Sequence, residues 1–292
     1  MSETLNKYKD FVANFVRVHK EAVDIELGDF SQSSYNQDSP LKVLIFSPHP
    51  DDECVVGALP LRMKQELDAR VINVAVTLGS NVARKDGRLD ELQKACKTLG
   101  FEIILPGEKA LDGVNLKTKE NDAATWAKNV EAIKNILLTE KPQVMFFPHV
   151  EDFNSSHIGV NLLLMEAIEA ASKEEPWNSL IIETEFWQMM DQPNLMIGLS
   201  HEDEATLIYA LSAHTEEVQR NPYHLNHPAR MLDNVTRGSE VVGGQGGQAV
   251  ECDFAMIYRA KLLKDGQVSL AYDGGKTIDN TASLQELIDL ID

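Results

Sequence analysis

Short apolar runs alternate with amphipathic segments along most of this chain, and this alternation limits the folds that it can adopt. Five runs rich in β-branched and aliphatic residues predict strands, at Lys42–Phe46, Val71–Thr77, Glu102–Leu105, Gln143–Phe147 and Leu180–Phe186. Segments with helical spacing lie near or between them, at Ala58–Leu67, Gly87–Leu99, Asp122–Leu138 and Ile158–Ala171. We therefore expect an α/β fold with a largely parallel sheet and helices on both faces.

The two ends of the chain are less regular. Six apolar residues at helical spacing predict an amphipathic helix at the start, namely Leu5, Tyr8, Phe11, Val12, Phe15 and Val16. The polar stretch Ser31–Ser39 reads as a linker. We therefore divide the chain into an N-terminal extension, residues 1–40, and one α/β domain, residues 41–292. The extension could pack on the domain or mediate assembly. A homo-oligomer is open for the protein as a whole. Beyond Glu185 we expect a helix at Glu202–Val218 and a late strand at Cys252–Tyr258.

Composition excludes several classes of partner. The chain has 292 residues, of which 43% are hydrophobic, so it can bury a substantial core. Its net charge of −19 argues against nucleic acid and anionic membrane surfaces as partners, because both attract basic patches. Three cysteines, Cys54, Cys96 and Cys252, form no paired motif and are expected to be reduced thiols. We find no signal peptide or membrane span and expect a cytoplasmic protein.

The richest chemistry lies in Ser47–Glu53, Ser-Pro-His-Pro-Asp-Asp-Glu, directly after the first predicted strand. The prolines prevent a helix from starting inside this motif. One imidazole and three carboxylates therefore crowd the end of a strand, which is where open α/β sheets place their sites. Carboxylates this close repel one another, and His with Asp is a ligand set suited to a divalent metal such as zinc. The alternative is an ordinary proline-rich loop with solvated acids.

A second polar cluster, Pro148–His157, follows the fourth predicted strand and could face the first across a crevice. His157 opens the next helix. Together with His49 and Asp52 it would make a three-ligand metal site with one open position, as catalytic zinc sites have. His149 could bond a nearby carbonyl, and we expect it to stand behind the ligands or to face the substrate.

These motifs resemble those of the PIG-L/LmbE-like deacetylases, zinc-dependent hydrolases that remove the acetyl group from N-acetylglucosamine and related amino sugars. The resemblance rests on Ser47–Glu53. It extends through shorter matches at Val76–Gly79, Arg84, Arg88–Glu91, Leu99–Gly100, Leu111–Gly113, Pro148–Val160 and Ala210–His214. It implies a Rossmann-like fold and one zinc ion per chain.

The resemblance also implies a role for individual residues. It makes His49, Asp52 and His157 the metal ligands and Asp51 the general base. Arg88 and Asp112 match positions that contact sugar hydroxyls, and Arg84 is a second candidate for such a contact. The expected partner is a small amino-sugar substrate.

The chain departs from the family in the second motif. Where the family often has His-Pro-Asp-His, this sequence has Asn154-Ser155-Ser156-His157. Asn154 can donate to an oxyanion but cannot act as a general acid. His214 could take over the role of the missing histidine, or zinc alone could suffice. His214 could equally be a structural histidine of the helix predicted around it. His224 and His227 lie in a loop-like context and are expected to be structural or substrate-lining.

We predict a metal-dependent amidohydrolase, an enzyme that cleaves linear amides. Asp51 would take a proton from water and return it to the departing nitrogen. Two alternatives remain open. One is a metal-dependent phosphoesterase on a similar scaffold. The other is a sugar-binding protein that has lost activity, although such a protein would have no need of Asp51.

Overall fold

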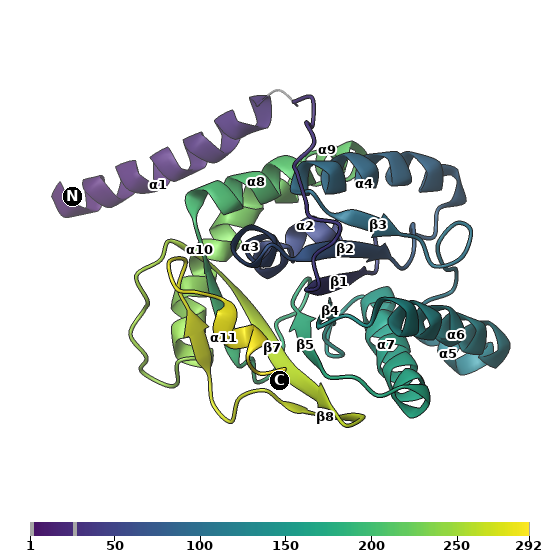
Figure 1. Ribbon diagram of the computed structural model, residues 1–292. Coiled ribbons are helices and arrows are strands. Elements are labelled where there is room, and N and C mark those ends of the chain that lie inside the picture. The colour runs from purple at the N-terminus through teal and green to yellow at the C-terminus, as the bar shows by residue number, and fades with distance from the viewer. Residues whose placement is uncertain (1–2, 26–27, 292) are drawn as a thin grey trace.

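The computed structural model describes residues 3–25 and 28–291, and a nine-stranded sheet forms its centre (Figure 1). Five strands run parallel to their neighbours, in the order β3 (Glu102–Ile104), β2 (Arg70–Ala75), β1 (Lys42–Ser47), β4 (Val144–Pro148) and β5 (Ser179–Thr184). The chain moves outward from β1 to β3 and then returns to place β4 on the other side of β1. The β1–β4 boundary is therefore a topological switch point, where sheets of this kind bind ligands.

The sheet continues past β5 with a largely antiparallel extension. β7 (Phe254–Lys264) pairs antiparallel with β5, and β6 (Leu195–Leu199) with β7. β9 (Lys276–Ile278) is parallel to β6, and β8 (Gln267–Leu270) forms a hairpin with β7. Most strand pairs are parallel, so the predicted fold class is confirmed. The predicted late strand, Cys252–Tyr258, overlaps the first five residues of β7, which begins at Phe254 and is longer than predicted.

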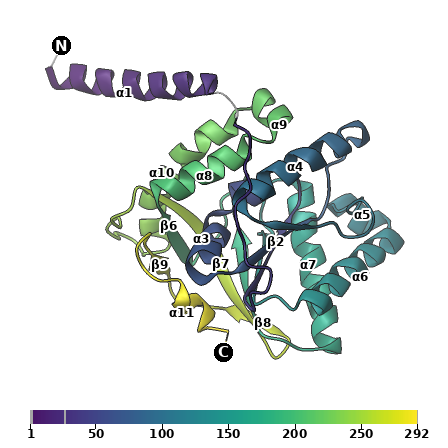
Figure 2. The ribbon, with the colours of Figure 1, turned by 45° about the horizontal axis from the view of Figure 1, so that its top comes forward.

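Helices cover both faces of the sheet (Figures 1 and 2). One face is covered by α2 (Asp52–Val55), α3 (Ala58–Leu67), α4 (Lys85–Leu99), α8 (His201–Leu211) and α11 (Gln285–Ile288). The other is covered by α6 (Ala123–Glu140) and α7 (Ser155–Glu174), with the short α5 (Leu116–Asn121) beside them. Successive residues of β1 separate accordingly, since Val43 and Ile45 belong to one core and Leu44 and Phe46 to the other.

The segment after α8 differs from the prediction. The helix expected at Glu202–Val218 is two helices, α8 and α9 (Thr215–Arg220), because His214 leaves the helical conformation with ψ +65°. The loop expected around His224 and His227 is the start of α10 (Tyr223–Val241). Pro228 lies inside α10, and a proline at that place in the sequence argues against a helix.

The first helix of the N-terminal extension projects from the body, whereas Phe30, farther along the extension, is buried against Tyr209. α1 (Glu3–Glu21) continues into the single turn η1 (Ala22–Asp24), and no residue of α1 is buried. Figures 1 and 2 both show α1 extending away from the body. The polar stretch after it crosses α4, where the Ser33 backbone N–H donates to the carbonyl of Lys97 at 3.0 Å. No helix among the described residues has the length and apolar character that crossing a membrane requires.

A buried arginine joins α3 to the C-terminal part of the chain. Arg62 is 1% exposed. Its Nη1 donates to the carbonyls of Gly198 and Asp279 at 2.8 and 3.0 Å, and its Nη2 donates to that of Ala282 at 2.9 Å. One charged side chain thus satisfies three backbone acceptors from two segments distant in sequence.

We predict that Arg62→Met lowers the free energy of unfolding by about 3 kcal/mol or more, because it leaves buried carbonyls without donors. Thermal unfolding of the two proteins measures the difference. The control is Arg17→Met, which removes an exposed ion pair to Glu21 within α1 and should change stability by less than about 0.5 kcal/mol. Equal effects of the two substitutions would contradict this account of Arg62.

Candidate active site

The candidate site lies at the carboxyl ends of β1 and β4, the two strands on either side of the switch point. Side chains fix the turns that leave these strands. Thr77 Oγ1 donates to the carbonyl of Pro48 at 2.7 Å, and Asn161 Nδ2 donates to that of Pro148 at 2.8 Å. Each proline-containing turn is thus fixed by a neighbouring element, and the two polar clusters predicted from the sequence meet.

Three side chains from these turns could hold a metal ion. The donor atoms of His49, Asp52 and His157 all lie within 4.8 Å of one another. His157 Nε2 is 3.7 Å from Asp52 Oδ1, and His49 Nδ1 is 3.7 Å from Asp52 Oδ2. These separations exceed hydrogen-bond length, so the atoms converge without bonding one another. Two imidazoles and a carboxylate are the donors that zinc and similar divalent ions take. The residues therefore fit a metal.

The ionisation of the two histidines differs. Burial, with His157 and Arg88 nearby, lowers the pKa of His49 to about 3, so its ring is neutral. Burial also lowers the pKa of His157, but the carboxylates of Asp52 and Asp152 outweigh it, and the net pKa is raised.

Asp152, which we did not select from the sequence, supports His157. Its Oδ2 lies 3.6 Å from His157 Nδ1, a buried atom that has no hydrogen-bond partner among the described residues. The carboxylate is itself held by the backbone N–H groups of Asn154 and Trp187, at 2.8 and 3.1 Å. A carboxylate behind a ligand histidine orients the ring and makes it a better ligand. The sequence could have indicated Asp152, because it stands in the second polar cluster, Pro148–His157, as His157 does.

Asp51 is buried beside the ligands and has a strained backbone, with φ +119°. The Tyr223 hydroxyl donates to its Oδ2 at 2.7 Å, and Arg88 Nη2 is 3.7 Å from the same oxygen. Its Oδ1 bonds no described residue. Burial raises the pKa of Asp51, although His214 and Arg88 oppose the rise. Tyr223 lies 172 residues away in sequence, and no local pattern indicated it.

Glu53 and His214 form a buried pair behind Asp51. His214 Nε2 is 2.8 Å from Glu53 Oε1, and the backbone N–H of Asp51 donates to Glu53 Oε2 at 2.9 Å. Both side chains are fully buried. His214 therefore lies outside the pocket described next, and its ring bonds to the residue that holds the Asp51 backbone. Glu53, Cys54 and His214 also approach one another, but the carboxylate of Glu53 is already engaged.

A pocket of about 310 Å³ opens beside the three candidate ligands. Arg84, Arg88, Arg220 and Glu217 line one part of it, and Phe186 and Trp187 line another. Glu217 pairs with all three arginines, with Arg84 Nη2 at 2.8 Å, with Arg88 Nη2 at 3.8 Å and in direct contact with Arg220. Burial raises the pKa of Glu217, but these guanidinium groups outweigh it and lower the net pKa.

Asn154 also lines the pocket, at the N-cap of α7. Its Oδ1 accepts a hydrogen bond from the Ser156 backbone N–H at 2.8 Å, which caps the helix. Its Nδ2 donates to no described residue. The side chain can therefore cap α7 and still present a donor to a bound molecule.

Other candidates selected from the sequence lie outside the pocket. Asp112 is exposed and pairs with Lys85, so the structure does not bring it to Arg88. His149 is held at both ring nitrogens, by Glu151 at 2.9 Å and by the carbonyl of Gln188 at 2.8 Å. His227 is likewise held by Glu204 and the carbonyl of Val55. These two histidines have structural partners.

Comparison with known proteins confirms the resemblance inferred from the sequence. The family model described as PIG-L, GlcNAc-PI de-N-acetylase, matches residues 44–168, which include both polar clusters. No curated protein matches the chain significantly.

Solved structures share the fold at low sequence identity. N,N'-diacetylchitobiose deacetylase from Pyrococcus horikoshii is 16% identical, with a TM-score of 0.53 over 88% of this chain and 93% of that one. The zinc-inhibited form of teicoplanin deacetylase Orf2 is 14% identical, with a TM-score of 0.55 over 80% and 100%. GalB, a 4-carboxy-2-hydroxymuconate hydratase from Pseudomonas putida KT2440, is 14% identical, with a TM-score of 0.57 over 75% and 95%. The fold therefore accommodates more than one reaction.

Gly79 allows Arg88 to reach the pocket. Its φ is +84°, and a Cβ there would lie 2.5 Å from Arg88 Nη1. We predict that Gly79→Ala lowers the free energy of unfolding by about 1–2 kcal/mol, because alanine disfavours this conformation. Gly87→Ala is the matched control, since its Cβ would meet nothing within 4 Å on α4, and it should raise stability by up to about 1 kcal/mol. Thermal unfolding should give opposite signs, and shifts of the same sign would contradict this prediction.

Proposed function

We propose that this protein is a zinc-dependent N-deacetylase that acts on N-acetylglucosamine or a related amino sugar or conjugate. One observation carries the proposal. A convergent His49, Asp52 and His157 set lies beside a buried carboxylate, Asp51, that is not part of the set. The match of residues 44–168 to the GlcNAc-PI de-N-acetylase family model supports the same reaction.

The assigned roles follow from the chemistry of an amide, whose carbonyl is weakly electrophilic and whose amine leaves poorly. A bound zinc ion polarises such a carbonyl and lowers the pKa of water from ~15.7 to about 7. Asp51 Oδ1 accepts the proton of the attacking water and returns it to the departing nitrogen. Tyr223 occupies Oδ2 and fixes the orientation of the carboxylate.

The donor set supports one zinc ion per chain. His49, Asp52 and His157 supply three ligands, as catalytic zinc sites do, and leave a position for substrate or water. Asp152 would raise the basicity of His157 and hold its ring.

The pocket supports a substrate of roughly one sugar ring. Its volume of about 310 Å³ is at the lower end of ligand sites, which span roughly 300–1,000 Å³. The guanidinium groups of Arg84 and Arg88 can donate to hydroxyl groups, while Phe186 and Trp187 offer apolar faces to the ring. Asp112 plays no part in this proposal, because it lies outside the pocket.

Two alternatives are less well supported. Many phosphoesterases use two metal ions. The other group of potential metal ligands, Glu53, Cys54 and His214, is fully buried, and Glu53 is already bonded to His214, so it does not favour a second metal ion. A sugar-binding protein without activity would have no use for a strained, buried Asp51.

Acetate release tests the proposal. Incubation of the zinc-loaded protein with a panel of N-acetylated sugars and conjugates should release acetate from at least one of them. Asp51→Asn should bind zinc normally and lose about 10²–10⁴-fold in turnover. His157→Ala should lose zinc, as measured by elemental analysis. Full zinc occupancy in His157→Ala would overturn the ligand assignment, and normal turnover by Asp51→Asn would overturn the base.

Three further variants decide which residue assists the oxyanion. We expect Asn154→Ala to lower turnover by about 10–10³-fold, because it removes a donor facing the carbonyl oxygen. Asn154→Asp should be worse, since it places a negative charge where one develops. His214→Ala should act mainly by loosening Glu53 and Asp51, so it should lower thermal stability as well as turnover. If His214→Ala folds normally but is inactive while both Asn154 variants keep wild-type turnover, then His214 is the residue that assists the oxyanion.

A further inference from the structure

The N-terminal helix presents a broad apolar face, from Leu5 to Val18, that no other described residue buries, whereas His19 near its end bonds Asn226 of the same chain at 2.9 Å. Seven large apolar side chains of α1 are between 45% and 66% exposed, namely Leu5, Tyr8, Phe11, Val12, Phe15, Val16 and Val18. In proteins, most helical stability comes from packing of an apolar face rather than from intrinsic propensity. We therefore expect another molecule to pack against this face.

The spacing within this face is that of a helix-pairing seam. Leu5, Tyr8, Val12, Phe15, His19 and Ala22 alternate at intervals of three and four. This is the a and d pattern of a seven-residue repeat, which places one side of a helix against a second helix.

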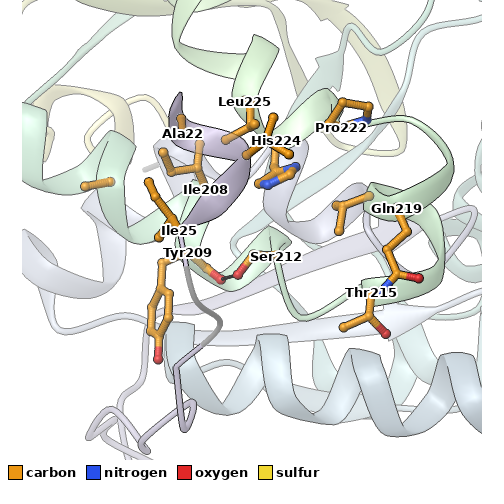
Figure 3. Close-up of a pocket in the computed structure, with 13 residues that line it drawn as sticks. Ala22, Ile25, Ile208, Tyr209, Ser212, Thr215, Gln219, Pro222, His224 and Leu225 are labelled. Carbon is orange, nitrogen blue, oxygen red and sulfur yellow. Dashed lines mark hydrogen bonds between the residues drawn. The ribbon is translucent and has the colours of Figure 1, made fainter. Parts of the chain in front are cut away.

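An apolar hollow adjoins the end of this seam. It has a volume of about 520 Å³ and lies between the segment after α1 and the helices α8, α9 and α10 (Figure 3). Ala22 and Ile25 line it on one side, and Ile208 and Leu225 on another. His224 also lines it, and its buried Nδ1 has no hydrogen-bond partner among the described residues. The seam and the hollow form one apolar surface, because Ala22 belongs to both.

We propose that a second copy of this chain covers this surface, with the two α1 helices packed antiparallel. In an antiparallel pair, a positions face d positions. With the two-fold axis between Val12 and Phe15, Leu5 of one copy faces Ala22 of the other, and Tyr8 faces His19. Leu5 and Tyr8 of each copy are then delivered to the hollow of the other. The same contacts form twice, as a two-fold interface requires.

Charge favours this partner and this orientation. Residues 3–21 carry Lys7, Lys9, Arg17 and Lys20 against Glu3, Asp10 and Glu21, a net charge of +1. Because the whole chain carries −19, the remainder carries −20. The strongly acidic body makes an anionic membrane an unfavourable partner. In a parallel pair the two acidic bodies would meet at one end. An antiparallel pair separates them by about the length of the helix, roughly 28 Å, beyond the ~8 Å screening length at physiological salt.

Molar mass in solution tests the dimer. Light scattering on the full chain should give twice 32.5 kDa. Phe15→Asp should halve this mass, because it places a charge in the seam. The matched control is Asn14→Asp, which adds a charge to the same exposed helix outside the seam and should leave the dimer intact. A monomeric wild type, or a Phe15→Asp variant that stays dimeric, would overturn the proposal.

Cysteine cross-linking tests the orientation in a Cys252→Ser background, where the remaining cysteines, Cys54 and Cys96, are buried. A mixture of Leu5→Cys and Ala22→Cys chains should form a disulfide-linked heterodimer. Leu5→Cys alone should not, since the two copies of residue 5 lie at opposite ends. Self-linkage of Leu5→Cys would show a parallel pair and overturn the orientation. A wild type that stays monomeric and sediments with phosphatidylcholine–phosphatidylserine vesicles would replace the second copy with a membrane.

Discussion

Three consecutive carboxylates are buried at the end of β1, and the structure around them depends on keeping them apart. Each has a different destination. Asp51 turns to Tyr223 and Arg88, Asp52 turns to the two histidines, and Glu53 turns to His214. These partners come from the turn after β1, from α4, α7 and α10, and from the N-cap of α9, so segments far apart in sequence converge on one turn. Burying like charges without partners would be very costly. The helices are placed so that each carboxylate has a partner side chain.

The fold was largely predictable because its signal is local. Buried parallel strands form continuous apolar runs, and the five predicted strands agree with β1 to β5 to within two residues at each end. The later part was harder to predict. A helix that contains Pro228 carries a strong breaker signal, and β6, β8 and β9 are short strands whose pairing is decided by neighbours distant in sequence. The break between α8 and α9 also has a distant cause, since the His214 ring is held by Glu53 from the other half of the chain.

The sequence indicated candidate site residues only where they stand in short motifs with a recognisable set of polar side chains. His49 and Asp52 follow β1 directly, His157 lies in the first turn of α7 after β4, and the topology brings their donor atoms within 4.8 Å of one another. Two residues that position other side chains of the site stand in no recognisable sequence motif. Tyr223 donates to Asp51 although it is 172 residues away in sequence. Glu217, a residue of α9, pairs with three arginines. Asp112 pairs with Lys85 and does not line the pocket in this structure. Spacing along a chain does not tell on which side of a loop a side chain will lie.

The backbone of Asp51 has a consequence for how this protein tolerates change. A φ of +119° suits glycine, yet the position holds an aspartate. Strain of this kind costs roughly 1–3 kcal/mol and persists only where the surroundings enforce it. Selection for stability alone would therefore favour glycine here, and selection for chemistry would oppose it. Replacing Asp51 by glycine would relieve the backbone strain and remove the carboxylate that we propose as the base, so in this proposal stability and turnover favour different residues at one position.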